Sequence, residues 1–305
     1  MNKIILSILI ISFPIHLFGQ MFPESDQYVY NPLVINPAFA GCQDALSVSV
    51  MYRNQWVGFK DAPKSYMFTA HLPLDNDRVG LGLIMENNSI GIFRETRLLG
   101  NYAYRMNLFN GKLAFGVGFG ITLYNIDWNQ LAATDQNDIQ LINNPYSAAL
   151  PAFSLGTYYY TKKYFIGISL PLFLSHEIDQ LTGNYKISNN FSGYNYFLTG
   201  GYYADITPNI KLLPSMLIKY YPNNTPQADI NVQLDLRDKF WIGMGYRNKD
   251  ILVGMLQCQL NTQLKVAYSY DFNFGQIGKY TYGSHEIVLN YLFSYSRKVR
   301  GPRQY

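Results

Sequence analysis

The sequence is poor in charged residues and, after residue 20, in long apolar runs. Charged residues make up 14% of the chain, whereas an ordinary soluble protein carries about 25%. No stretch after residue 20 approaches the roughly 20 apolar residues that a transmembrane helix needs. Any residence in a membrane therefore has to be through strands.

Cysteine is scarce as well, and residues suited to catalysis are scattered. Cys42 and Cys258 are too few for a disulfide framework; two unpaired residues are favoured, and a single disulfide stays open. His71, His176 and His285 have no spacing typical of a metal site or a catalytic triad. The net charge of +4 is spread along the chain, apart from a basic cluster at the end. We therefore expect no enzyme, no cofactor, no metal and no nucleic-acid partner.

The N-terminus resembles an export signal. Lys3 precedes an apolar run from Ile4 to Phe18, and Gly19 supplies a small residue before a cleavage site at Gln20. We divide the chain into a signal peptide (1–19), a periplasmic N-terminal segment (20–44), a β-barrel (45–293) and a basic C-terminal tail (294–305).

Aromatic residues are abundant and recur with a period of two. They make up 16% of the chain, with 27 tyrosines, and from Ala45 onwards apolar positions alternate with small or polar ones. This alternation is typical of strands with one apolar and one polar face. It predicts about fourteen strands, at residues 45–56, 64–73, 78–88, 93–108, 111–127, 152–162, 163–173, 195–206, 209–221, 227–237, 239–248, 251–261, 262–273 and 284–293.

The expected connections alternate in length. Long ones, including 128–151 and 174–194, fall on one side, while the turns on the other side are short. This asymmetry is typical of outer-membrane barrels, whose periplasmic turns are short. We therefore predict a transmembrane antiparallel β-barrel in the outer membrane, with both termini periplasmic. A soluble β-sandwich is the disfavoured alternative.

Three features bear on the interior of the barrel. Charges of both signs are predicted to face inward, which favours a polar lumen braced by ion pairs over a charge-selective conduit. Glycines near positions 80, 116 and 243 also face inward; they make room either for neighbouring side chains, the favoured reading, or for a plug or passing polypeptide. The Asn-Pro steps before the first strand predict an irregular segment that either enters the barrel or forms a partner-binding arm.

Short motifs follow one another along the chain, among them Asn36-Pro37-Ala38-Phe39-Ala40-Gly41, Tyr52-Arg53, Gly245-Tyr246-Arg247 and Gly283-Ser284-His285-Glu286-Ile287. Together they resemble the PorP/SprF family of type IX secretion membrane proteins. Each is weak alone, but their shared order spans nearly the whole mature chain, with Asp61 as a departure where the family often has glycine. The residues of these motifs that we take as candidate functional positions are Asn31, Pro32, Asn36, Pro37, Tyr52, Arg53, Gln55, Trp56, Tyr104, Arg105, Asp229, Asn231, Tyr246, Arg247, Asp271, His285 and Glu286.

The resemblance implies an outer-membrane accessory of type IX protein secretion that assists export or surface attachment of large secreted proteins such as gliding adhesins. Expected partners are type IX secretion components, a secreted cargo protein with a C-terminal sorting domain, or both, together with outer-membrane lipid. Trp128 and Tyr146 in the long external loops are candidate partner contacts, since recognition often resides on loops of a rigid scaffold. The alternative is an outer-membrane solute channel or hydrophobic-ligand transporter.

Overall fold

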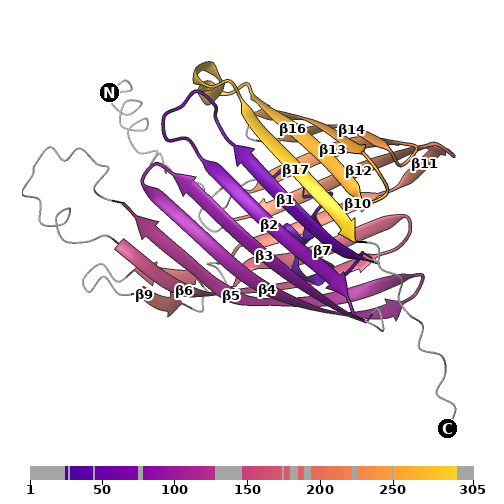
Figure 1. Cartoon of the computed structure of the whole chain (residues 1–305), viewed down its shortest axis with the longest axis horizontal. Coiled ribbons are helices and arrows are strands. Elements are labelled where there is room, and N and C mark those ends of the chain that lie inside the picture. Colours follow the sequence, from indigo (N-terminus) through magenta and orange to yellow (C-terminus); the bar gives the residue numbers. More distant parts are fainter. Residues whose placement is uncertain are drawn as a thin grey trace, which may run out of the picture.

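A computed structural model describes residues 25–26, 28–43, 45–74, 78–127, 146–173, 175–178, 185–188, 194–221, 225–248 and 250–293. The predicted signal peptide, the basic tail and Trp128 lie outside these residues. Antiparallel strands tilted against one another form the wall of a barrel (Figure 1). Among the described residues, no helix is long and apolar enough to cross a membrane.

The strands fall close to the positions expected from the alternating pattern. They are β1 (Leu46–Asn54), β2 (Lys64–Pro73), β3 (Val79–Ile90), β4 (Phe93–Leu108), β5 (Gly111–Ile126), β6 (Tyr146–Tyr160), β7 (Tyr164–Phe173), β8 (Ser175–Ile178), β9 (Tyr185–Ser188), β10 (Tyr196–Tyr202), β11 (Ala204–Thr207), β12 (Ile210–Tyr220), β13 (Gln227–Leu236), β14 (Phe240–Arg247), β15 (Ile251–Gln259), β16 (Leu264–Asn273) and β17 (Ser284–Phe293).

Two pairings complete the ring of strands. β1 pairs with β17, which joins the first strand to the last, and β10 pairs with β12. β10 and β11 both pair with β12 and form one wall strand, so the barrel has 14 strands. The short β8 and β9 pair only with each other in a separate two-stranded sheet. The prediction of a roughly fourteen-stranded transmembrane barrel is confirmed.

The two faces of the wall differ as a membrane barrel requires. In β4, buried and exposed residues alternate along nearly the whole strand. Arg97, Asn101 and Arg105 are buried in the lumen, while Leu98 and Tyr102 are 41% and 46% exposed on the outer face. Apolar residues facing outward and polar residues facing inward are typical of outer-membrane barrels, in which lipid surrounds the wall.

The two ends of the barrel also differ. Connections 74–78, 109–110, 161–163, 208–209, 237–239 and 260–263 lie at one end, which we name the short-turn end. The opposite, long-loop end carries 55–63, 127–145, 174–195 and 274–283 together with three shorter connections. The chain enters β1 and leaves β17 at the short-turn end. By the usual polarity of such barrels, the long-loop end faces the cell exterior.

Two differences from the predicted elements concern the long connections. The sixth strand begins at Tyr146 and not at residue 152, because residues 146–151 continue the pairing with β5 as far as Ile126. Ser147, Ala148 and Ala149 have little intrinsic strand preference, so only the neighbouring strand specifies this extension. Within the predicted 174–194 loop, β8 and β9 form a hairpin.

Candidate functional site: a plugged lumen

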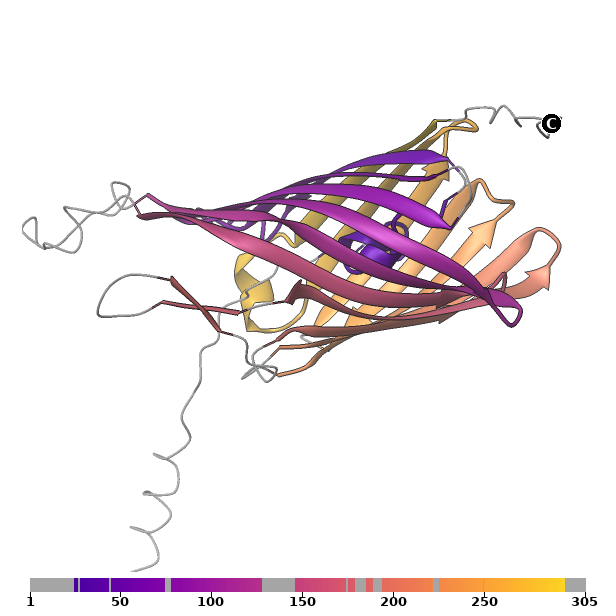
Figure 2. The same cartoon turned by 90° about the horizontal axis from the view of Figure 1, so that it is seen from below.

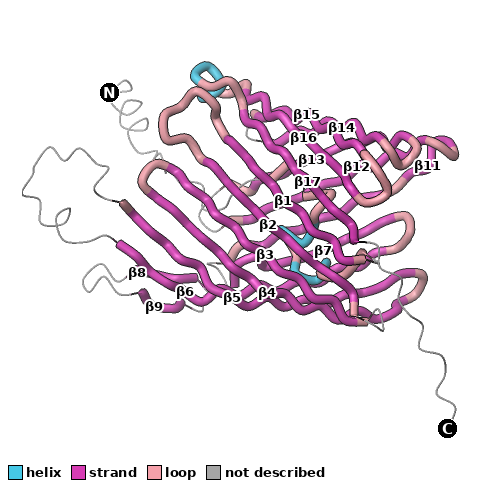
Figure 3. The backbone as a smooth tube through the Cα atoms, in the orientation of Figure 1, coloured by secondary structure: helices cyan, strands magenta, loops and turns pink. Residues whose placement is uncertain are grey.

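The segment before the first strand lies inside the barrel. Residues 25, 26 and 28–43, which we name the plug, run through the lumen, where their helical turns are surrounded by strands (Figures 2 and 3). Two short 3-10 turns shape the plug: η1 (Pro32–Val34) and η2 (Pro37–Phe39). Each turn begins with proline, whose fixed φ suits the first helical position, and the Asn36 side chain accepts a hydrogen bond from the Ala38 amide at 3.0 Å.

The plug spans the lumen from the long-loop end to the short-turn end. Its first residues meet wall residues beside the long loops, since the Asp26 amide donates to Glu286 near the start of β17 at 3.0 Å. Midway, Asn31 donates to Thr69 at 2.8 Å. The Gly41 amide then donates to Nδ1 of His71 at 3.2 Å, near the end of β2 and the short turn that follows it. The sequence left open whether this segment enters the barrel, and the described residues lie within it.

Inward-facing glycines of the wall make room for the plug backbone. A Cβ added at Gly80 would lie 2.0 Å from the carbonyl oxygen of Ala40, and one at Gly116 would lie 2.1 Å from the Ala38 nitrogen. At Gly156 the added atom would lie 2.1 Å from the Asn36 side-chain oxygen. Contacts this short exclude any larger residue unless the plug moves, so these glycines are needed for close approach of the plug.

Other inward glycines accommodate the wall itself. An added Cβ at Gly118 would lie 2.1 Å from the Ser154 hydroxyl, and one at Gly245 would lie 2.1 Å from the Asn231 side chain. Both readings offered by the sequence therefore apply, at different positions. Which of the two roles a glycine has depends on whether the plug passes beside it.

Some wall side chains hold the plug by its main chain. Ser169 donates to the Ile35 carbonyl oxygen at 2.6 Å, and Arg105 donates to the Ala40 carbonyl oxygen at 3.2 Å. These bonds satisfy backbone groups of an irregular segment that no ladder can pair. The reverse arrangement occurs at Asn36, a plug residue whose amide donates to the Thr157 carbonyl oxygen of β6 at 2.9 Å.

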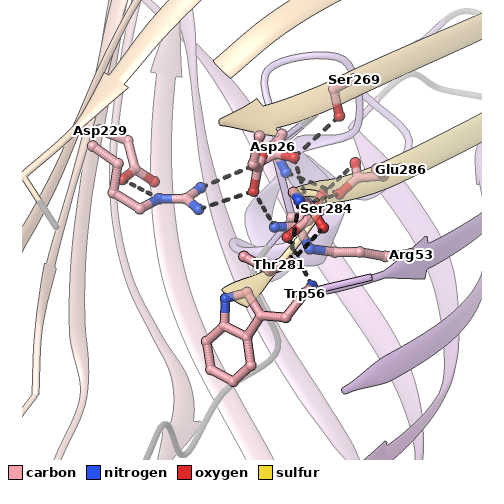
Figure 4. A network of polar contacts seen from close by, with 12 residues as sticks. Asp26, Arg53, Trp56, Asp229, Ser269, Thr281, Ser284 and Glu286 are labelled. Atoms are coloured by element: carbon pink, nitrogen blue, oxygen red, sulfur yellow. Dashed lines mark hydrogen bonds and ion pairs between the residues drawn. The ribbon is translucent and has the colours of Figure 1, made fainter. Parts of the chain in front are cut away.

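A buried network of charges fastens the first residues of the plug (Figure 4). The Asp26 carboxylate pairs with Arg53 on one oxygen and with Arg247 at 3.0 Å on the other, and it accepts from the Ser269 hydroxyl at 3.1 Å. Asp26 is buried, and the two arginines supply the opposite charge that a buried carboxylate requires.

The wall supplies further carboxylates around the same arginines. Arg53 also pairs with Asp271 and, at 3.2 Å, with Glu286, while Arg247 pairs with Asp229 at 2.8 Å. All of these side chains are buried. The network links strands β1, β13, β14, β16 and β17 around the plug residue Asp26, and it matches the predicted lumen braced by ion pairs.

The candidate positions from the family motifs divide into two groups. Those that form the plug or contact it are Asn31, Pro32, Asn36, Pro37, Arg53, Arg105, Asn231, Arg247 and Glu286, with Asp229 and Asp271 in the surrounding ion-pair network.

The remaining motif residues lie away from the plug. Tyr104 and Tyr246 are 39% and 43% exposed on the outer face. His285 shares a hydrogen bond of 2.7 Å with the Tyr268 hydroxyl on the same side of the wall. Tyr52 packs against Tyr66 with ring centroids 5.0 Å apart. The outward position of these rings suits the lipid interface and not a lumen site.

Gln55 and Trp56 shape the first long loop. The Gln55 amide bonds to the Pro63 carbonyl oxygen at 2.9 Å, and the Trp56 amide donates to the Ser284 hydroxyl at 3.2 Å. Trp56 has a positive φ of 50°, which is uncommon for a bulky residue. These residues join the loop to the start of β17, beside the charge network.

Sequence reasoning missed the plug residues that make the tightest polar contacts. Asp26 stands in the irregular segment without a motif around it, and Tyr28, which accepts from Asn231 at 2.7 Å, looks like one of many tyrosines. A signal was present in Asp26 itself, because an acidic residue in a segment so rich in apolar residues needs a buried partner if the segment enters the barrel.

Neither metal ligation nor a disulfide is a feature of the described part of the chain. It contains no group of three or more His, Cys, Asp or Glu residues placed to hold a metal ion. Cys42 and Cys258 are unpaired. Cys42 packs against Ala38 of the plug, whereas Cys258 lies among the residues of β15 that face outward. The barrel wall therefore separates the two cysteines.

Solved structures similar to this chain are outer-membrane proteins. The CymD monoaromatic hydrocarbon channel aligns with a TM-score of 0.55 and 12% identity, covering 91% of this chain and 95% of its own. Omp33 of Acinetobacter baumannii aligns with a TM-score of 0.50 and 6% identity, covering 82% of this chain and 99% of its own. At such identities the likeness extends to the fold alone. No curated protein matches the chain in sequence.

The family is shown by sequence. The model of the type IX secretion system membrane protein PorP/SprF matches residues 18–291, which include the plug and all wall strands except the end of β17. Together with the barrel fold, this match assigns the protein to the outer membrane. The chain belongs to the PorP/SprF family of type IX secretion system membrane proteins.

Proposed function

We propose that this protein is an accessory of type IX secretion that works by binding other proteins, assisting the export or surface attachment of large secreted proteins such as gliding adhesins. Membership of the family supports a role in type IX secretion. The plugged lumen is the observation that supports binding over conduction, because the plug passes through the space that a solute would have to cross.

The fit between plug and wall is close. Leu33, Ala38 and Ala40 of the plug are at most 1% exposed. Two cavities beside the plug, one near Tyr28 and one near Asn31, have volumes of about 10 Å³ each, which is about the space for one water molecule. With the plug in this position, these cavities offer no continuous route for a solute.

The long-loop end is the proposed cargo side. Loops 55–63 and 274–283 are tied together there, since the Val57 amide bonds to the Gly283 carbonyl oxygen at 2.8 Å and the Tyr282 amide bonds back to Val57 at 2.7 Å. Tyr280 and Tyr282 on the second loop are 73% and 77% exposed. Exposed tyrosines on a braced loop are suited to a protein interface, where aromatic residues are enriched.

Of the earlier candidates, Tyr146 lies at the same end of the barrel, whereas Trp128 lies outside the described residues. Tyr146 is the first residue of β6, and Trp128 precedes it in the connection from β5. We keep both as proposed cargo contacts alongside the two tyrosines of the 274–283 loop. Type IX machinery in the periplasm would meet the opposite end, where Phe109 is 92% exposed in the short turn after β4 and where the basic tail follows β17.

A channel for solutes or hydrophobic ligands is the second candidate function, favoured by the similarity of the fold to the CymD hydrocarbon channel. It requires the plug to leave its position or rearrange. The two candidates differ in a direct measurement, because a channel conducts or takes up small molecules as the purified protein, whereas a binding accessory does not.

The deciding experiment is a pull-down from outer membranes after cross-linking in cells, with partners identified by mass spectrometry. Recovery of type IX components or of one large secreted protein with a C-terminal sorting domain supports the accessory role. Recovery of neither, together with conductance of the purified wild-type protein in planar bilayers, overturns it in favour of the channel.

Paired variants sharpen this experiment. Replacing Tyr280 and Tyr282 with serine changes the long-loop end, and Phe109→Ser changes the short-turn end, while neither touches the plug. We expect the tyrosine variant to lose the secreted cargo and the Phe109 variant to lose periplasmic components, each keeping the other partner. Equal loss from both variants would point to impaired folding, which heat-modifiable electrophoretic mobility detects.

A further inference from the structure

The direction of the plug has a consequence for the topology of the chain. Its fastening at Asp26 uses Arg53, the penultimate residue of β1, and Arg247, the last residue of β14. Both strands end at loops of the long-loop end. The Ser25 hydroxyl donates to Glu286 at 3.1 Å, three residues after the 274–283 loop ends. The plug therefore starts beside the long loops.

The other end of the plug is fixed at the opposite mouth. Gly41 lies against Leu72 and Gly80, on either side of the 74–78 turn. Only a few residues later the chain enters β1 at Leu46, which pairs with Phe293 at the end of β17. The plug is thus tethered to the wall at the short-turn end, and its free end points away from that tether.

The route back through the barrel is occupied. Tyr28, Leu33, Ala38 and Ala40 are each at most 2% exposed along the depth of the lumen, and Gly80 and Gly116 leave no space even for an added methyl group beside the plug. At these depths the described plug fills the lumen, with no space for a second stretch of chain beside it.

We propose that the Ser25 end of the plug lies at the cell-surface mouth of the barrel, so that this end is approached by extracellular proteins and not by periplasmic ones. The inference needs only the barrel, its polarity and the plug, and it holds whether the protein acts as a secretion accessory or as a channel. It differs from the expectation of a periplasmic N-terminal segment, which followed from the lengths of the connections between strands.

An epitope placed in three positions of the full chain tests the proposal. One copy is inserted between Phe22 and Pro23, after the predicted cleavage site; a second is inserted at Lys60, in a long loop; and a third is inserted at Asn110, in a short turn. Antibody binding is compared between intact cells and cells with a permeabilised outer membrane.

We expect the Phe22 and Lys60 epitopes to be detected on intact cells and the Asn110 epitope only after permeabilisation. An epitope at Phe22 that behaves like the one at Asn110 overturns the proposal. If the insertion prevents folding, Phe22→Cys in a chain with Cys42→Ser and Cys258→Ser serves instead. A membrane-impermeant maleimide then labels position 22 on intact cells if the proposal is right, and only after permeabilisation if it is wrong.

Discussion

Removing the carboxylate of Asp26 is the most direct test of how the plug is held. In the Asp26→Ala variant the plug loses two charged hydrogen bonds to arginine and one from the Ser269 hydroxyl. A hydrogen bond to a charged group contributes about 1.5–3 kcal/mol. The loss stays below the sum of three such bonds, because Arg53 keeps Glu286 and Arg247 keeps Asp229 as partners.

We therefore expect the free energy that docks the first plug residues to fall by about 2–4 kcal/mol. Since about 1.4 kcal/mol corresponds to a tenfold change in an equilibrium constant, the undocked fraction should rise roughly 30- to 700-fold. Hydrogen–deuterium exchange of the purified protein measures this opening, because the Asp26 amide is itself bonded to Glu286 in the docked state.

The matched control is Glu86→Gln. Glu86 is a buried lumen carboxylate that pairs with Arg97 at 3.0 Å, outside the Asp26 network. Exchange in the peptide that begins at Ser25 should accelerate in Asp26→Ala and stay at the wild-type rate in Glu86→Gln. Equal exchange in wild type and Asp26→Ala would refute the reasoning, since the network would then contribute nothing to plug docking.

Three further predictions follow from single positions. Gly116→Val should expel or distort the plug, because its Cβ would lie 2.1 Å from the Ala38 nitrogen. The variant should then conduct in planar bilayers, whereas the control Gly254→Val, which has open space around the added Cβ, should not. Phe109→Gly should stabilise the protein by about 1 kcal/mol, since a left-handed φ of 49° is unfavourable for a residue with a side chain; an unchanged or lower thermal midpoint would contradict this. Asn36→Ala removes the cap of η2 and should weaken plug docking by about 1–2 kcal/mol, measured as faster amide exchange at Ala38.

The wall of the barrel could be predicted from sequence because its information is local. Alternation in β4 places Arg97 and Arg105 in the lumen and Tyr102 toward lipid, and the short connection at Asn110 marks a turn without knowledge of any other strand. The start of β6 escaped prediction because small residues there carry no such pattern. Pairing with β5 decides it instead.

The site was predicted only in part, because its contacts are distant in sequence. Alternation gives the inward direction of Arg53, Arg247 and Glu286. It cannot say that these residues gather around one plug residue, Asp26, since Asp26 and Glu286 are separated by 260 positions. The plug lacks regular structure, so no periodic signal indicates its depth or direction in the lumen.

The charge network also orders the assembly of the protein in time. Asp26 and Arg53 belong to the beginning of the chain, whereas Asp271 and Glu286 arrive with its final two strands. Until β17 pairs with β1, Arg53 lacks the wall carboxylates that complete its surroundings. Stable docking of the plug thus comes after barrel closure. A chain that ends before β17 would lack both the pairing of β17 with β1 and the bonds from Glu286 to Ser25 and Asp26.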